Sequence, residues 1–197
     1  MRPVATREEY RAYLDSLDRA CLHPLVREGF RHWRGLLNGR RFPGRAEVDP
    51  IAVPRSLPQI SIVDVDPGAT GFRLRLLGHH NRLFQGVRSG EDIQDVRPEQ
   101  GRDRIVARLR LCAAEARPIR GVYRYKPVQA QAAVWAEVVS CPLSDDQQSV
   151  THIVSFGADF EERRAAILAL PLTMRRGMLE AEGRAALELL DSKKKTE

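Results

Sequence analysis

The prolines between residues 40 and 59 constrain the fold of this chain more than any other sequence feature. They are Pro43, Pro50, Pro54 and Pro58. Each proline fixes φ and lacks a backbone N–H, so no long helix can pass through this segment. We therefore expect it to be extended or to form short turns. From Ile60 the chain reads Ile-Ser-Ile-Val-Asp-Val-Asp, which predicts a strand over 60–66 that ends at the turn Pro67-Gly68.

Two helices are predicted before this connector. The first begins near Thr6, whose side chain can cap a helix that has Glu8 and Glu9 in its first turn. The second begins at Pro24, because proline is favoured as a first helical residue, and Asn38-Gly39 is a typical helix end. Apolar residues recur at helical spacing in both segments, which predicts that each helix buries one face.

After the connector, strands alternate with one helical segment. Strands are predicted at 60–66, 71–78, 119–127, 132–143 and 150–160, with a helix over 99–116. In the second strand Phe72, Leu74 and Leu76 alternate with arginines, which is typical of an antiparallel sheet that buries one face. Short local connections favour an α+β fold, with a five-stranded antiparallel sheet and helices on one face.

Residues 161–197 are predicted to be helical again and to end in a charged tail. Pro171 interrupts this segment, and Met174 and Met178 belong to its apolar residues. We therefore expect an N-terminal helical extension (1–39), a sheet domain (40–160) and a C-terminal helical extension (161–197).

The composition is that of a globular protein. The chain has 197 residues, of which 43% are hydrophobic and 29% charged, enough for one domain with a real core. No apolar run approaches the ~20 residues needed to cross a bilayer. The N-terminus also lacks the apolar stretch of a signal peptide. A cytoplasmic protein without a membrane span is expected.

The net charge of +6 raises the question of nucleic-acid binding. The arginines are scattered among acidic residues, and no nucleic-acid-binding motif is present. Arginines occur on a predicted strand (Arg73, Arg75) and on the predicted middle helix (Arg102, Arg104, Arg108, Arg110). We interpret them as a solvated basic surface, with attraction to an acidic partner or an anionic surface as the alternative. Nucleic acid is not expected as a partner.

No motif for catalysis or metal binding is present. Cys21, Cys112 and Cys141 are widely separated and form no CxxC pair, so free thiols packed as small hydrophobes are expected. His79-His80 invites a metal or haem reading, but neighbouring strand residues point to opposite faces. A surface position or a hydrogen-bonding role in a pocket are the alternatives. With no GxSxG, HExxH or Walker loop, we predict no catalytic residue, no metal site and no enzyme activity.

Several short pieces, taken in order, resemble a known family. A helix with Phe30, Trp33 and Leu36 precedes Asn-Gly-Arg-Arg, Phe-Pro-Gly-Arg-Ala-Glu-Val-Asp-Pro and Val-Pro-Arg-Ser-Leu-Pro. A strand ending Val-Asp-Val-Asp and the piece Phe-Arg-Leu-Arg-Leu-Leu-Gly follow. This run, from about Phe30 to Phe160, resembles bacterial stand-alone PAS proteins, which are small sensor-type domains with no fused enzyme. The resemblance implies a PAS fold, in agreement with the predicted order of elements. It departs from the family at His79, where a small hydroxyl residue is usual.

The resemblance also implies sensing or docking. In PAS domains a small ligand, when present, lies between the concave sheet face and the helical middle. Here the implied pocket would be lined by Leu76, His79, Leu83, Phe84, Ile105, Leu109, Tyr123 and Trp135. The alternative is that these residues fill a dry core. There is no flavin-reactive cysteine motif, so the cofactor, if any, is unknown from the sequence.

Helices outside PAS domains often pair between subunits and transmit a signal. Here a homodimer or a partner protein would use Tyr10, Tyr13, Leu14, Leu17, Met174 and Met178. The alternative is that both helical extensions pack on their own sheet. We therefore predict a regulatory module that binds a small ligand, a signalling partner protein or both. A small enzyme or ligand carrier that uses the same pocket is the alternative function.

Overall fold

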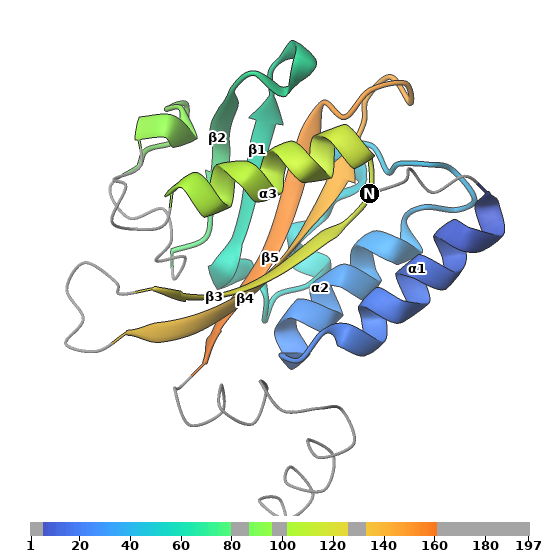
Figure 1. Ribbon diagram of the computed structural model, residues 1–197, viewed down its shortest axis with the longest axis horizontal. Coiled ribbons are helices and arrows are strands. Elements are labelled where there is room, and N and C mark those ends of the chain that lie inside the picture. The colour runs from blue at the N-terminus through green and yellow to red at the C-terminus, as the bar shows by residue number, and fades with distance from the viewer. Residues whose placement is uncertain (1–5, 80–86, 96–101, 126–132, 161–197) are drawn as a thin grey trace, which may run out of the picture. The chain divides into compact units, whose positions relative to one another are not determined.

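The computed structural model describes residues 6–79, 87–95, 102–125 and 133–160 (Figure 1). These residues form a five-stranded antiparallel sheet in the order β2-β1-β5-β4-β3. Its strands are β1 (Ile60–Val65), β2 (Phe72–Leu77), β3 (Ile119–Tyr125), β4 (Val134–Leu143) and β5 (His152–Phe160). The predicted α+β fold, with its five antiparallel strands, is confirmed.

Three α-helices accompany the sheet in the described part of the chain: α1 (Arg7–Ala20), α2 (Pro24–Gly35) and α3 (Arg102–Glu115). The start of α1 is the predicted one. The Thr6 hydroxyl accepts a hydrogen bond from the Glu9 backbone N–H, and the Glu9 carboxylate accepts one from the Thr6 backbone N–H. Helix α2 begins at Pro24, and the turn after it places Asn38 (φ 44°) and Gly39 (φ 79°) in the left-handed region.

The proline-containing connector forms three short 3₁₀ turns and no long helix, as its prolines predict. The turns are Arg45–Glu47, Pro50–Ala52 and Leu57–Gln59. The last of them leads directly into β1. The connector therefore carries the chain from the end of α2 to the first strand of the sheet.

Helices pack on both faces of the sheet. Residues that alternate along a strand point to opposite faces, and on β4 Val138 belongs to one buried cluster while Val139 belongs to the other. Residues of α3 belong to the buried cluster of Val138, and residues of α1 and α2 belong to that of Val139, so these helices cover opposite faces. Figure 1 shows α3 lying apart from α1 and α2. The middle helix lies on one face as predicted. Since α1 and α2 share a core with the sheet, a domain boundary at residue 39 stays a prediction.

The buried carboxylate of Glu137 on β4 joins the turn between α1 and α2 to the sheet. It is fully buried and accepts hydrogen bonds from the backbone N–H groups of Leu22 (3.0 Å) and His23 (2.7 Å). The Arg120 guanidinium on β3 pairs with the same carboxylate. One acidic side chain therefore satisfies two backbone donors of the turn and one cation of the sheet.

The three cysteines are free and buried, as expected from their spacing. Burial raises the pKa of Cys21 to about 12 and raises those of Cys112 and Cys141 well above the ordinary thiol value. The reactive species is the thiolate, so we expect no thiol to react with Ellman's reagent in the native protein and three per chain after denaturation. A thiol that reacts within minutes in the native protein would contradict this packing.

Candidate functional site

The face of α3 that points to the sheet contains one charged residue. Ile105, Leu109 and Cys112 are buried there, and Arg108 lies among them with only 6% of its surface exposed. The interpretation of Arg108 as part of a solvated surface was therefore wrong. The physical reason is helical geometry, because residue 108 lies three positions after Ile105 and four before Cys112, on the same helical face.

Arg108 belongs to a small polar cluster between α3 and the sheet. Its Nε donates to the Ser140 hydroxyl (2.8 Å), which is hydrogen-bonded to the Ser155 hydroxyl (2.8 Å). Its guanidinium carbon lies 5.2 Å from the centroid of the Tyr123 ring. We call Arg108, Tyr123, Ser140 and Ser155 the Arg108 cluster. It joins α3 to strands β3, β4 and β5.

Two buried atoms of the Arg108 cluster have no hydrogen-bond partner among the residues that the structure describes. They are Nη1 of Arg108 and the hydroxyl oxygen of Tyr123. No carboxylate of the described chain forms an ion pair with Arg108, and burial lowers the pKa of its guanidinium to about 10. Buried polar groups in folded proteins are nearly always paired. These two atoms therefore mark a place where a polar ligand would be stabilised.

Gly121 makes room for the Tyr123 ring. A Cβ atom at residue 121 would lie 2.6 Å from Cε1 of Tyr123, closer than side chains tolerate. The two residues are on the same face of β3 because they are two positions apart. The absence of a side chain at Gly121 thus allows the ring to lie along the strand, next to Arg108.

The structure brings together only some of the residues predicted for the pocket. Ile105 and Leu109 are buried on the face of α3 that points to the sheet, and Tyr123 belongs to the Arg108 cluster. Leu76 packs instead against the cluster on the α1 and α2 face, and strand alternation places the half-buried Trp135 on that face too.

The structure does not place the other predicted pocket residues at this site. His79 is exposed just after β2. Leu83 and Phe84 lie outside the described residues. A contribution of these three residues to a ligand site stays a prediction.

Some of the residues predicted for a subunit contact pack within their own chain instead. Leu14 and Leu17 are buried in the core on the α1 and α2 face. Tyr10 and Tyr13 pack against that core, and the Tyr13 hydroxyl donates to the Pro118 carbonyl. Met174 and Met178 lie outside the described residues. Their use by a second subunit or a partner stays a prediction.

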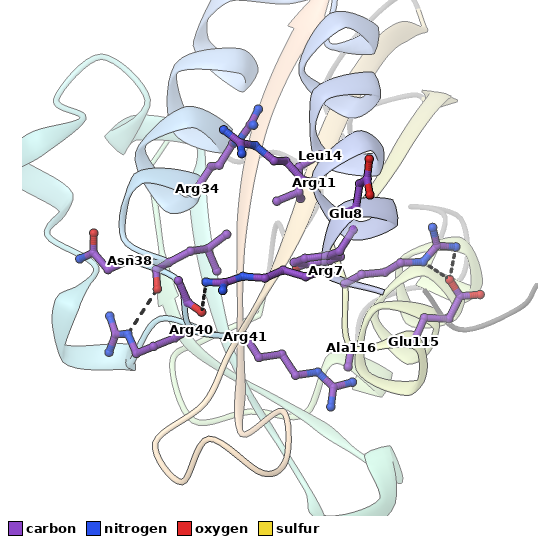
Figure 2. Close-up of a pocket in the computed structure, with 14 residues that line it drawn as sticks. Arg7, Glu8, Arg11, Leu14, Arg34, Asn38, Arg40, Arg41, Glu115 and Ala116 are labelled. Atoms are coloured by element: carbon purple, nitrogen blue, oxygen red, sulfur yellow. Dashed lines mark hydrogen bonds and ion pairs between the residues drawn. The ribbon is translucent and has the colours of Figure 1, made fainter. Parts of the chain in front are cut away.

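A second feature is an open hollow of about 1330 Å³ between α1, the end of α2 with its following turn, and the end of α3 (Figure 2). Six of its fourteen lining residues are arginines, and we call it the arginine hollow: Arg7, Arg11, Arg34, Arg40, Arg41 and Arg117. Sequence reasoning missed it because these arginines come from segments far apart in the chain. Its only signal was the overall basic charge.

Only part of this charge is neutralised. Within the described residues, Arg34 pairs with Asp15, Arg40 with Glu47 and Arg117 with Glu115. The three other arginines, Arg7, Arg11 and Arg41, form no ion pair there, and Arg7 donates only to the Gly39 carbonyl (3.2 Å). The hollow therefore keeps a net positive charge, exposed to solvent.

The structure pairs His152, which has no nearby partner in the sequence, with two carboxylates. Its ring nitrogens lie 2.9 Å from Asp64 and 2.8 Å from Asp145. The hydrogen bond to His152 holds the pKa of Asp145 below its usual value. The described residues contain no cluster of His, Cys, Asp and Glu that could hold a metal ion. None of their helices has the length and apolar character needed to span a membrane.

Comparison with known proteins gives one family match. The profile of a family described as "PAS domain" matches residues 22–157. No curated protein sequence matches the chain.

Several solved structures resemble the chain at low sequence identity. A sensory box sensor histidine kinase from Vibrio cholerae is 12% identical, with 56% of this chain and 90% of that chain covered and a TM-score of 0.40. A light-oxygen-voltage domain is also 12% identical, with 68% and 93% covered and a TM-score of 0.42. An RNA-binding light-oxygen-voltage receptor is 18% identical, with 71% and 38% covered and a TM-score of 0.42.

Proposed function

This chain belongs to the PAS domain family, and from that premise we propose that it is a regulatory sensor module that binds a small ligand between α3 and the sheet. The observation that supports the proposal is a pair of buried atoms in the Arg108 cluster, Nη1 of Arg108 and the hydroxyl of Tyr123, which have no hydrogen-bond partner in the described part of the chain. Both lie on the α3 side of the sheet, the side on which PAS proteins are expected to hold a ligand.

The energetic argument compares a ligand site with a dry core. An unpaired buried polar group costs about 1–3 kcal/mol, and more when it is charged. In a core that holds no ligand, we would expect an apolar side chain at position 108, or a carboxylate that pairs with the arginine. Small-molecule sites, in contrast, combine an apolar lining with a few convergent polar groups. Ile105 and Leu109 supply the apolar lining, and Arg108 and Tyr123 supply the polar groups.

Native mass spectrometry of the freshly purified protein, with an absorbance scan, tests this proposal. We expect a small molecule to be retained by the wild type and to be lost from Arg108→Gln. If the wild type carries no molecule and no compound of a metabolite library raises its Tm, the interior is a dry core and the proposal fails. Turnover of the bound molecule would favour the alternative function, a small enzyme or ligand carrier.

We further propose that the arginine hollow docks an acidic segment of a signalling partner protein. Arg7, Arg11 and Arg41 are exposed there without a carboxylate partner in the described chain. At about 1330 Å³ the hollow exceeds the ~300–1,000 Å³ of typical small-ligand pockets, which favours a peptide segment. Guanidinium groups bind carboxylates in a bidentate manner, so the chemistry matches a segment rich in Asp and Glu.

A triple charge reversal tests this docking site. We expect Arg7→Glu, Arg11→Glu and Arg41→Glu together to weaken binding of a Glu-rich decapeptide about tenfold, because three exposed ion pairs contribute about 0.5 kcal/mol each. Fluorescence anisotropy at low salt measures the effect.

The matched control changes three exposed arginines outside the hollow, Arg73, Arg104 and Arg110, to glutamate. It has the same net charge as the test variant. If both variants weaken binding equally, the attraction is a property of the overall charge and the hollow is not the docking site. Tighter binding of a single-stranded oligonucleotide than of the peptide would favour nucleic acid instead.

The proposed homodimer rests on the helical extensions. Leu14 and Leu17 are buried within their own chain. Of the four α1 residues predicted for the contact, the half-buried Tyr10 and Tyr13 therefore retain some exposed surface for a second subunit. Sedimentation of the wild type, and of a variant with both tyrosines changed to serine, measures the mass. A monomeric wild type would end this proposal.

A further inference from the structure

We infer that the interior site at Arg108 takes a small organic ligand that carries a carboxylate group, an inference that rests on the proposed ligand-binding function. It adds a chemical class to that function. The atoms that would recognise the ligand are Nη1 of Arg108 and the hydroxyl of Tyr123, both unpartnered in the described chain.

The first step concerns charge. Arg108 remains protonated at neutral pH even though burial lowers its pKa to about 10. A buried cation is stable only when a counter-charge and hydrogen bonds compensate its lost hydration. Within the residues that the structure describes, the compensation consists of one hydroxyl, that of Ser140, and the face of the Tyr123 ring. An anionic ligand supplies the missing charge.

The second step concerns geometry. The Nε of Arg108 already donates to Ser140, whereas its Nη1 is buried and has no hydrogen-bond partner among the described residues. The guanidinium lies over the Tyr123 ring, so the vacant guanidinium nitrogen and the phenol are on the same side of the sheet. A carboxylate has two oxygen atoms and can accept one hydrogen bond from each donor. A phosphate, with about two charges and three oxygens, would exceed what this single cation and two donors neutralise.

The third step concerns the rest of the ligand. The buried residues around the Arg108 cluster on the α3 side are apolar, and they include Ile105, Leu109, Val138 and Ile153. An apolar lining favours a ligand with an aliphatic or aromatic body. The chemistry of the site therefore points to a monocarboxylate with an apolar chain or ring.

A purely structural role of Arg108 and a role in ligand binding predict different effects of Arg108→Met on the Tm. If the arginine served only to hold α3 on the sheet, Arg108→Met would lower the Tm. A buried charge without a counter-ion is instead replaced by an apolar residue at no cost or with a gain in stability. We therefore expect Arg108→Met to keep or raise the Tm of the ligand-free protein while it removes carboxylate binding. A gain in stability with a loss of binding is typical of residues kept for function.

The experiment uses the full chain and two pairs of probes, benzoate with benzamide and hexanoate with hexanamide. Calorimetric titration and Tm shifts are measured for the wild type, Arg108→Met and Tyr123→Phe. We expect the carboxylates to bind the wild type and the amides to bind at least tenfold more weakly. Affinity for the carboxylates should fall about ten- to a hundredfold in Arg108→Met and about two- to tenfold in Tyr123→Phe. The phenylalanine variant removes only a hydroxyl, so it tests the site even if the methionine variant does not fold.

The outcomes separate this inference from the function on which it rests. If the amides bind as well as the carboxylates, or if a neutral or cationic molecule co-purifies, the ligand-binding function stands and the carboxylate inference is overturned. Binding of inorganic phosphate alone overturns it too, as does a lowered Tm of ligand-free Arg108→Met. If no probe binds and no molecule co-purifies, both proposals fail.

Discussion

Replacing Glu137 with alanine is expected to lower the free energy of unfolding by about 3–5 kcal/mol, the usual cost of removing one partner of a buried ion pair. The Glu137 side chain is fully buried. Its loss would leave the guanidinium of Arg120 and the backbone N–H groups of Leu22 and His23 without their acceptor. The turn between α1 and α2 would then lose its attachment to β4, so we also expect faster hydrogen exchange in both helices.

Urea unfolding followed by circular dichroism measures this effect. Asp18→Ala is a suitable control, because Asp18 also pairs with an arginine, Arg31, but the Arg31 side chain is 61% exposed. Exposed ion pairs contribute at most about 1 kcal/mol. If Glu137→Ala costs no more than the control variant, the carboxylate does not hold the helices on the sheet.

The second large effect is expected at Trp33. Trp33→Ala should destabilise the protein by about 3–5 kcal/mol, because it removes a large, fully buried side chain and leaves a cavity. Trp33 on α2 stacks on Phe30 with 6.0 Å between ring centroids, and its indole N–H donates to the Pro142 carbonyl of β4 (3.0 Å). It therefore joins α2 to the sheet by both packing and a hydrogen bond.

Two further variants separate these contributions. Trp33→Phe keeps most of the volume and loses the hydrogen bond, so we expect a loss of about 1–2 kcal/mol. Trp135→Ala should cost only about 1 kcal/mol, because Trp135 is half-buried on β4. Equal losses for alanine at the two tryptophans, measured by urea unfolding, would contradict the difference in their burial.

The order of elements could be predicted from local sequence. The prolines after residue 40 prevent a long helix, and the alternation of Phe72, Leu74 and Leu76 with arginines is a strand pattern whatever lies next to it. The predicted strand 71–78 corresponds to Phe72–Leu77, and 60–66 to Ile60–Val65. Such boundary differences arise because strand ends depend on the length of the neighbouring strand.

The Arg108 cluster could be predicted only in part. Ile105, Leu109 and Tyr123 were expected near a ligand on the basis of the family resemblance. Arg108 was not, because arginine is rarely buried without a partner. Its position between Ile105 and Cys112 on the helical repeat was the available signal. The helical pattern could not show the hydrogen-bond partner of Arg108, because that partner, Ser140, is 32 residues further along the chain.

The sequence by itself determined the α+β class and the succession of helices and strands, because these follow from φ restrictions, side-chain periodicity and short connections. The family was indicated separately, by the resemblance of several sequence pieces taken in order. Only the tertiary structure decided which side chains meet. Sheet register and helix packing bring Glu137 to Leu22 across 115 residues, His152 to Asp64 across 88, and Arg108 to Ser140. The charge of a buried site depends on such long-range partners, so the interior cation and the arginine hollow could be recognised only in the folded chain.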